Sequence, residues 1–528
     1  MKLIKKNFFL ILLLIYFFTG AYYSLTNGIS HDEFHEQRNW EFNISLVKNI
    51  LFDNKINPEF IGYQDKYYGI GFQIISQPIQ FFLSKFLIKF QEVDIYGAHL
   101  ISKHFVVFSF YFLSGIFVYL IVSSLIKNKL FSIISTFLYL LYPYLFGHGL
   151  FNPKDIPFLT LWLACTYVST KIFCNLTKEE APKFYEIIFL SLLSSLLISI
   201  RISGVLIFLQ YLATFTIFYT SQKINFIELT KIYYKKLFLF ILSTIFITYI
   251  LYPIFWKNPF LFFEALSYMS KHFNDVCTLT YGDCLKSKDL NPSYIPLWLS
   301  VKLPVIILIG LLLLPFTEKK IFSNKTNNIT YGTLLFSAFF IPFFLILKRT
   351  HLYDELRQIL FLVPIIFIVG VISLYVFSRK FFYILGFSTL LIFIVENIKI
   401  NPYQYTWFNI PSRVMDLGKN FELDYWGLSG KDLAQKFSKL NDSELSKRPC
   451  LLASPLHLVK PFLDSKKYNC FGLWSEIDSN YERPFWAIQN VRNLKKGKSY
   501  KCSVIYQSKY NFLFSKKDII MGKLIKCI

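Results

Sequence analysis

Long apolar segments are the feature that most constrains this sequence, because a run of about 20 apolar residues can cross a bilayer as a helix. Such runs follow one another as far as residue 398 and contain few charged side chains. With 54% hydrophobic and 17% charged residues, the chain does not suit a series of soluble cores. We therefore predict an all-α polytopic membrane protein.

Hydropathy predicts about eleven transmembrane helices. Their ranges are 7–25, 97–126, 130–147, 156–174, 186–200, 202–220, 235–256, 293–315, 331–347, 357–377 and 381–398. The first of them also has the basic start of a secretory signal, but its apolar stretch is long for a signal and no clear A-x-A site follows. We expect a transmembrane domain at 1–398 and a soluble domain at 399–528.

Basic residues in alternate loops predict the orientation, since short cytoplasmic loops are rich in Lys and Arg. The clusters are Lys2, Lys5 and Lys6; Lys127 and Lys129; Lys171, Lys178 and Lys183; Lys223, Lys231, Lys235 and Lys236; Lys319, Lys320 and Lys325; and Arg379 and Lys380. The N-terminus is then cytoplasmic, and the C-terminal domain lies outside a bacterial-type inner membrane. Because the orientation in the membrane already accounts for these basic clusters, the net charge of +23 does not indicate a nucleic-acid partner.

Six of the eight cysteines fall on the predicted outer side, where disulfides are favoured. Cys277 and Cys284 flank a short turn and are expected to pair with each other. Cys165 and Cys174 lie in or at the end of a span, where they act as small apolar residues. The remaining four permit three pairings, which sequence does not rank: Cys450, Cys470, Cys502 and Cys527.

Segments outside the spans also have recognisable patterns. Residues 40–52 and 70–90 have helical periodicity and suit helices in the membrane interface, although 70–90 can also be read as another short span. After residue 399 the apolar runs stop and strand-like stretches begin, so we expect a small α/β domain. The strand-like stretches are Cys450–Pro455, Pro484–Val491 and Lys501–Gln507, and the helical one is Asp432–Leu440.

Charged residues gather at the outer edge of the membrane, which is costly and therefore indicates a function. Residues 31–36 contain three carboxylates and two imidazoles directly after the first span. Asp155 lies at the mouth of a later span, where it can also serve simply as a helix cap. Cations arrive from the same side: Lys66, Lys154, Arg201, Arg357 and, close to Arg357, His351. Each of these cations can also extend toward lipid headgroups, but together they describe a site that binds a phosphate while deprotonating another group.

These motifs resemble those of GT-C-fold membrane glycosyltransferases that use polyprenyl-phosphate sugars. The group includes the protein O-mannosyltransferases and the lipid A aminoarabinose transferases, and is glycosyltransferase family 39-like. The resemblance rests on the order of an Asp-Glu pair after the first span, Asp155 in the second outer loop, and Arg357 leading a span through 361–364. It covers about the first 410 residues in layout. It implies a GT-C-like fold.

The resemblance also implies roles for residues. Asp32 matches the catalytic base, with Glu33 beside it as the alternative base, while Lys66 and Arg357 match positions that hold the donor phosphate. Arg201 stands where relatives often have lysine, which leaves its own phosphate role open.

The expected function is transfer of a sugar from a polyprenyl-phosphate donor to an acceptor hydroxyl, with inversion. The acceptor is a glycan, a lipid or a protein. No cofactor is expected, because basic side chains can neutralise the phosphate; a divalent cation is the alternative that the clustered carboxylates leave open. A transporter or flippase for a lipid-linked sugar is the alternative. It would place its charged groups near the bilayer midplane rather than at one edge. A structural scaffold would explain the C-terminal domain but not the convergence of charged residues.

Overall fold

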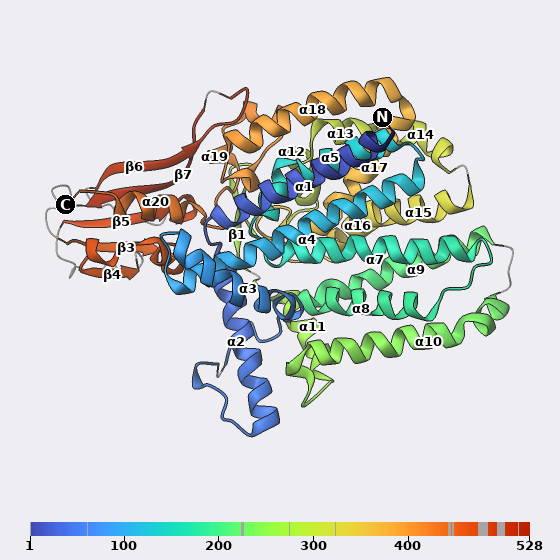
Figure 1. Ribbon diagram of the computed structural model, residues 1–528, viewed down its shortest axis with the longest axis horizontal. Helices are drawn as coiled ribbons and strands as arrows, with labels where there is room; N and C mark the ends of the chain where they lie inside the picture. The colour runs from blue at the N-terminus through green and yellow to red at the C-terminus, as the bar shows by residue number, and fades with distance from the viewer. Residues whose placement is uncertain are drawn as a thin grey trace.

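The computed structural model of the chain has apolar helices aligned along its long axis and a small β-sheet domain at one end (Figure 1). It describes residues 2–527 apart from 61, 223–225, 274, 323, 442–444, 446–447, 474–483, 494–501 and 516, and the side chains of 2–8 and 226–230 are also outside the description. The N-terminus lies at the end of the bundle away from the sheet. The side of the membrane that each end faces stays a prediction.

Among the described residues, eight helices are long and apolar enough to cross a membrane. The chain is therefore a multi-pass membrane protein. The eight are α1 (Lys2–Thr26), α4 (Ile95–Leu125), α7 (Asp155–Leu176), 202–221 with α9 (Ile207–Ser221), α10 (Phe226–Leu251), 325–347 with α15 (Lys325–Leu335) and α16 (Ile341–Leu347), 357–377 with α17 (Val363–Phe377), and α18 (Arg379–Lys399).

The other three predicted spans take different forms, and the remaining eight of the eleven correspond to the candidate spans found among the described residues. One is bent by 63° between α5 (Lys129–Leu140) and α6 (Pro143–Gly149). Another, α8 (Phe184–Ile200), has only 17 residues. The third, the predicted span 293–315, is divided into α12 (Tyr294–Lys302), α13 (Val305–Leu312) and α14 (Leu314–Ile321). Proline lacks an amide donor and favours a helix start. Pro143 therefore accounts for the bend between α5 and α6, and Pro304 for the break between α12 and α13.

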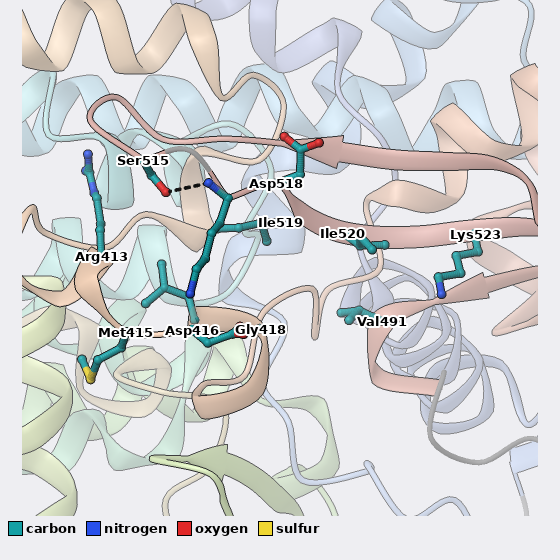
Figure 2. Close-up of a pocket in the computed structure, with 12 residues that line it drawn as sticks. Arg413, Met415, Asp416, Gly418, Val491, Ser515, Asp518, Ile519, Ile520 and Lys523 are labelled. Atoms are coloured by element: carbon teal, nitrogen blue, oxygen red, sulfur yellow. Dashed lines mark hydrogen bonds between the residues drawn. The ribbon is translucent and has the colours of Figure 1, made fainter.

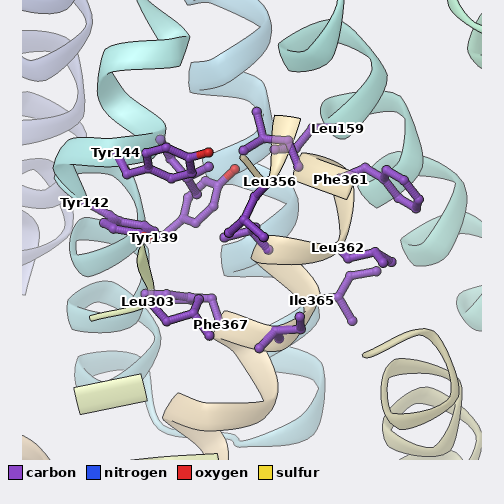
Figure 3. Packing of buried hydrophobic residues seen from close by; sticks show 14 of the residues in the cluster. Tyr139, Tyr142, Tyr144, Leu159, Leu303, Leu356, Phe361, Leu362, Ile365 and Phe367 are labelled. Atoms are coloured by element: carbon purple, nitrogen blue, oxygen red, sulfur yellow. The ribbon is translucent and has the colours of Figure 1, made fainter. Parts of the chain in front are cut away.

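The span that contains α17 is the centre of the bundle, and 94% of its most apolar stretch of 18 residues is buried. Figure 3 shows its start packed among Leu159 of α7, Tyr139 of α5 and Leu303. Close packing also needs small residues: a methyl group at Gly310 of α13 would collide with the carbonyl oxygen of Gly370 in α17. Arg357 lies just before α17 in the chain, so the close packing of this segment fixes the position of the Arg357 side chain.

Three helices and one hairpin lie at the end of the bundle that is nearer the sheet domain (Figure 1). They are α2 (His31–Phe52), α3 (Gly71–Phe90), α11 (Leu261–Lys271) and the antiparallel pair β1 (Cys277–Thr280) and β2 (Asp283–Lys286). The helices predicted at 40–52 and 70–90 are confirmed, and α3 packs against α4 without being one of the eight spans found among the described residues. Their place in the membrane interface stays a prediction. The expected Cys277–Cys284 disulfide is present.

The C-terminal domain is a five-stranded mixed sheet in the order β4-β3-β5-β7-β6. Its strands are β3 (Cys450–Ser454), β4 (Cys470–Leu473), β5 (Phe485–Asn490), β6 (Cys502–Tyr510) and β7 (Ile519–Cys527), accompanied by α19 (Leu417–Asn420) and α20 (Ser429–Ser438). The three predicted strands and the predicted helix are confirmed. Disulfides join neighbouring strands through the pairs Cys450–Cys470 and Cys502–Cys527.

This domain shares a hydrophobic core with the bundle. Leu433 and Phe437 of α20 belong to the same buried cluster as Leu87 of α3 and Leu100 of α4. Shared apolar burial is the main stabilising term between packed units. The domain is therefore seated against the bundle at a defined place.

Candidate active site

The first turn of α2 directs its two carboxylates to different places. One Glu33 oxygen accepts a hydrogen bond from the amide of Ser30 at 2.7 Å, and the other lies 2.8 Å from Nε2 of His104. The side chains of Glu33 and His104 are both fully buried. A glutamate at the third helical position that binds the N-cap amide forms part of a capping box. Glu33 therefore holds the start of α2, and it lies outside the cavity that Asp32 lines.

The face of α2 that carries Asp32 borders a cavity of about 500 Å³. His35, Glu36 and Asn39 follow Asp32 at intervals of three, four and seven residues, which places the four side chains on one helical face. The remaining walls come from the loop after α2, the start of α7, the loop before α17, and the C-terminal domain. Their polar residues include Asp65, Tyr68, Lys154, Tyr353, Asp354, Arg357, Tyr425, Ser454, Asn490 and Arg492.

Arg357 lies at the centre of the charged groups in this cavity. Its Nη2 contacts Asp32, its Nε lies 3.3 Å from Asp155 Oδ2, and its Nη1 lies 3.3 Å from Asp354 Oδ2. The ring of Trp426 covers the guanidinium with its centroid 4.2 Å from Cζ. Because a guanidinium is a rigid planar fork of donors, it fixes the relative positions of the three carboxylates.

Asp155, the first residue of α7, holds two arginines side by side. One of its oxygens contacts Nη2 of Arg201, and the other lies 3.3 Å from Nε of Arg357. Arg201 also donates a hydrogen bond to Gln358 Oε1 at 2.8 Å, and Asn152 donates to Asp155 Oδ2 at 2.9 Å. Asp155 thus positions cations, a role beyond capping its helix.

The loop before Arg357 has an unusual backbone and a buried anchor. Asp354 and Glu355 have positive φ angles of 53° and 66°, a conformation that residues other than glycine rarely adopt. The ammonium of Lys302 lies 2.9 Å from Glu355 Oε1, and both side chains have 0% exposure. The ring of Phe408 lies 3.8 Å from the same ammonium. This buried ion pair holds the loop that positions Arg357.

The C-terminal domain contributes Arg492, which the sequence analysis did not identify as a site residue. Nη2 of Arg492 lies 3.0 Å from Asp354 Oδ1, and its Nε lies 4.0 Å from Glu422 Oε1. Because Asp354 also contacts Arg357, ion pairs continue from this domain into the cavity. No short motif marks Arg492, since its role depends on packing between distant segments.

The two predicted lysines differ in where they lie. Lys154 lines the cavity, with its ammonium 2.6 Å from Glu36 Oε1 and 3.5 Å from the ring centroid of Tyr68. Lys66 is half-buried beside Tyr67, 5.0 Å from the centroid of that ring, and is not among the described residues that line the cavity. The structure therefore brings Lys154, and not Lys66, to the carboxylates.

A second cavity, of about 290 Å³, adjoins the first and is bordered mainly by apolar residues. Tyr68, Phe273 and Tyr353 contribute to both cavities. Arg201 and the predicted site residue His351 also line the second one. The paired arginines therefore lie between a charged cavity and an apolar one.

The cations keep the cavity carboxylates ionised. Burial raises the pKa of Asp32, but Arg357, Lys154 and the imidazoles of His31 and His35 together lower it by more, so the net pKa is far below the usual value. At Asp65 burial again raises the pKa, while a hydrogen bond from His272 lowers it to a net value below normal. Both groups are carboxylates at neutral pH, as a proton acceptor must be.

Another cavity, also about 290 Å³, lies in the C-terminal domain beside Arg413 and Asp416 (Figure 2). Arg413 is already bound to Glu396, with Nη2 3.0 Å from Oε2. The Lys517 amide donates to Ser515 Oγ at 3.3 Å, as the dashed line in Figure 2 shows. The carboxylates of α2 do not reach this cavity, and we assign no role to it. Within the described residues, no group of three or more His, Cys, Asp or Glu side chains has a geometry suited to a metal ion.

Comparison with known proteins gives structural matches only. No protein-family model matches the sequence, and no curated protein matches it. The chain is similar in structure to ArnT from Cupriavidus metallidurans. The apo crystal structure of that protein matches with 12% identity and a TM-score of 0.45, covering 99% of this chain and 97% of that one. The structure bound to undecaprenyl phosphate matches with 10% identity and a TM-score of 0.43, covering 99% and 98%. At these low scores the matches do not define a function, and the assignment of the site rests on its contacts.

Proposed function

We propose that this protein is a membrane glycosyltransferase that moves a sugar from a polyprenyl-phosphate donor to an acceptor hydroxyl. The reaction takes place at the outer face of the cytoplasmic membrane, beside the C-terminal domain. The observation that supports this proposal most directly is the cluster of Asp32, Asp155, Arg201 and Arg357 between a charged cavity and an apolar one. A GT-C-like architecture and the use of no resident cofactor are part of the same proposal.

The two arginines form the donor phosphate site. Arg201 and Arg357 lie side by side on Asp155, and guanidinium forks bind phosphate oxygens with short charge-assisted hydrogen bonds. Lys154 supplies a third cation at the cavity wall. The first isoprene units of the donor enter the adjoining apolar cavity, where burial of hydrocarbon is favourable.

Asp32 is the general base. As the acceptor oxygen forms its bond to the anomeric carbon, its O–H bond breaks and the proton passes to the Asp32 carboxylate. The bond between the anomeric carbon and the phosphate oxygen breaks at the same time, and its electron pair stays on the phosphate. Arg201 and Arg357 stabilise that developing charge. Attack opposite the phosphate inverts the anomeric centre.

The test is transfer from polyprenyl phosphate that carries a radiolabelled sugar, using purified full-length protein and an extract of envelope lipids and glycans as acceptors. We expect labelled acceptor and free polyprenyl phosphate as products. Arg357→Gln should reduce the rate of transfer by about 100-fold or more, because removal of one group that stabilises charge in the transition state typically costs that much. Arg379→Gln, an exposed arginine at the start of α18, removes the same charge elsewhere and should transfer normally.

Movement of intact labelled lipid across vesicle membranes without cleavage would support the flippase alternative instead. Normal transfer by Arg357→Gln would remove Arg357 from the donor site.

A further inference from the structure

The three carboxylates on Arg357 are not equally held. Asp155 has 2% exposure and Asp354 has 6%, whereas Asp32 has 16%. Asp155 is also bound by Arg201, and Asp354 is also bound by Arg492. Among the described residues, Arg357 is the one cation in a direct ion pair with Asp32. Asp32 is therefore the partner of Arg357 that is easiest to displace.

Each guanidinium nitrogen of Arg357 already contacts a carboxylate, which leaves one further N–H on Nη1 and one on Nη2. Its Nε, Nη1 and Nη2 each meet a different carboxylate. The Nη2 contact with Asp32 borders the cavity, because both residues line it. A phosphate that binds the cavity-facing Nη2 must share this nitrogen with the Asp32 carboxylate, and the two negative charges repel each other.

We propose that the donor phosphate displaces Asp32 from Arg357, so that the base becomes free to accept a proton only when donor is bound. This proposal rests on the function proposed above. Without donor, Arg357 neutralises Asp32 and keeps it away from the acceptor. With donor, Nη2 binds a phosphate oxygen and Asp32 faces the cavity.

The charge on Asp32 supports this exchange. While paired, its pKa is well below that of an ordinary aspartate, so it is a weak base. Loss of the Arg357 contact removes the main lowering influence and makes Asp32 a stronger base. The exchange therefore imposes an order in which the donor binds before the acceptor is activated.

The experiment measures binding of undecaprenyl phosphate to purified full-length protein in detergent micelles. Asp32→Asn keeps the side-chain volume but removes the competing charge, so we expect this variant to bind about tenfold more tightly, equivalent to about 1.4 kcal/mol. Asp65→Asn is the matched control, because it removes one carboxylate from the same cavity without a direct contact to Arg357. We expect Asp65→Asn to change affinity by less than about twofold, since no ion pair with Arg357 is lost.

The outcomes separate this inference from the proposed function. Unchanged or weaker binding by Asp32→Asn would overturn the displacement, and so would equal tightening in both variants, which would indicate a general charge effect. Arg357→Gln measures the phosphate site itself. If Arg357→Gln binds undecaprenyl phosphate as well as the wild type does, the donor assignment fails together with the displacement. If it binds weakly while Asp32→Asn shows no gain, only the displacement fails.

Discussion

Removal of both members of the Lys302–Glu355 pair should destabilise the protein much less than the sum of the two single removals. The two charges have 0% exposure and lie 2.9 Å apart. Breaking a buried pair by removing one partner leaves an uncompensated charge and costs about 3–5 kcal/mol. In Glu355→Gln, the Lys302 ammonium retains mainly the ring faces of Phe408, Tyr144 and Trp298, whose centroids lie 3.8, 4.9 and 5.6 Å away. Such contacts supply about 1–2 kcal/mol each when desolvated, and they are present in the wild type as well.

A double-mutant cycle in detergent provides the measurement. We expect Glu355→Gln and Lys302→Met each to lower the free energy of unfolding by about 3 kcal/mol, and the double variant to recover at least about 2 kcal/mol of their sum. Lys509 and Asp518 form the control, because their ion pair is shorter, at 2.6 Å, but their side chains are 51% and 42% exposed. That cycle should yield about 0–1 kcal/mol. Additive losses at Lys302 and Glu355, with a coupling energy below about 0.5 kcal/mol, would refute the reasoning.

Three further predictions concern the base, its charge and the topology. Asp32→Asn should lower turnover by about 100-fold or more, whereas Glu33→Gln should mainly lower stability, by about 1–3 kcal/mol, because it removes a buried capping contact. Transfer assays on both variants check this: a larger loss of turnover in Glu33→Gln would reassign the base. Because the folded-state pKa of Asp32 is lowered, its ion pair stabilises the protein above the unfolded pKa of about 3.9 and is lost as the pH falls below it. The free energy of unfolding of the wild type should accordingly fall below about pH 4, and more steeply than that of Asp32→Asn. If the two proteins lose stability in parallel as the pH falls, the Asp32–Arg357 pair does not stabilise the fold. An impermeant thiol reagent added to intact cells should label Lys439→Cys and leave Lys319→Cys unreacted until lysis, and the opposite pattern would invert the topology.

Much of the fold was predictable because it depends on local patterns. Apolar runs located the helices, and alternating residues located three strands of the C-terminal sheet. The division of some predicted spans into shorter helices was not predictable from these local patterns. Hydropathy does not distinguish a straight helix from two helices with a proline between them, as at Pro143 and Pro304. The forms of those two segments depend on backbone hydrogen bonds that a window average ignores.

The site was predictable only where charged residues lie directly beside a span in the sequence. Asp32 and Asp155 meet through Arg357, which the sequence pattern had brought to the same side of the membrane. Glu33 also carried a local signal, since Ser30 precedes it at the spacing of a capping box. Arg492 carried none, because its partner Asp354 is far away along the chain. Contacts of this kind depend on how the two domains pack.

The contact between Arg492 and Asp354 also has a consequence for biosynthesis. The cavity takes one wall from α2 near the start of the chain and another from Arg492, in the short helical turn that follows β5. A nascent chain that still lacks residue 492 can insert its helices, but its cavity is open on one side. The proposed sugar transfer would then begin only after synthesis has passed this point and the sheet has folded against the bundle. On this proposal, a truncated product would stay in the membrane without consuming lipid-linked sugar.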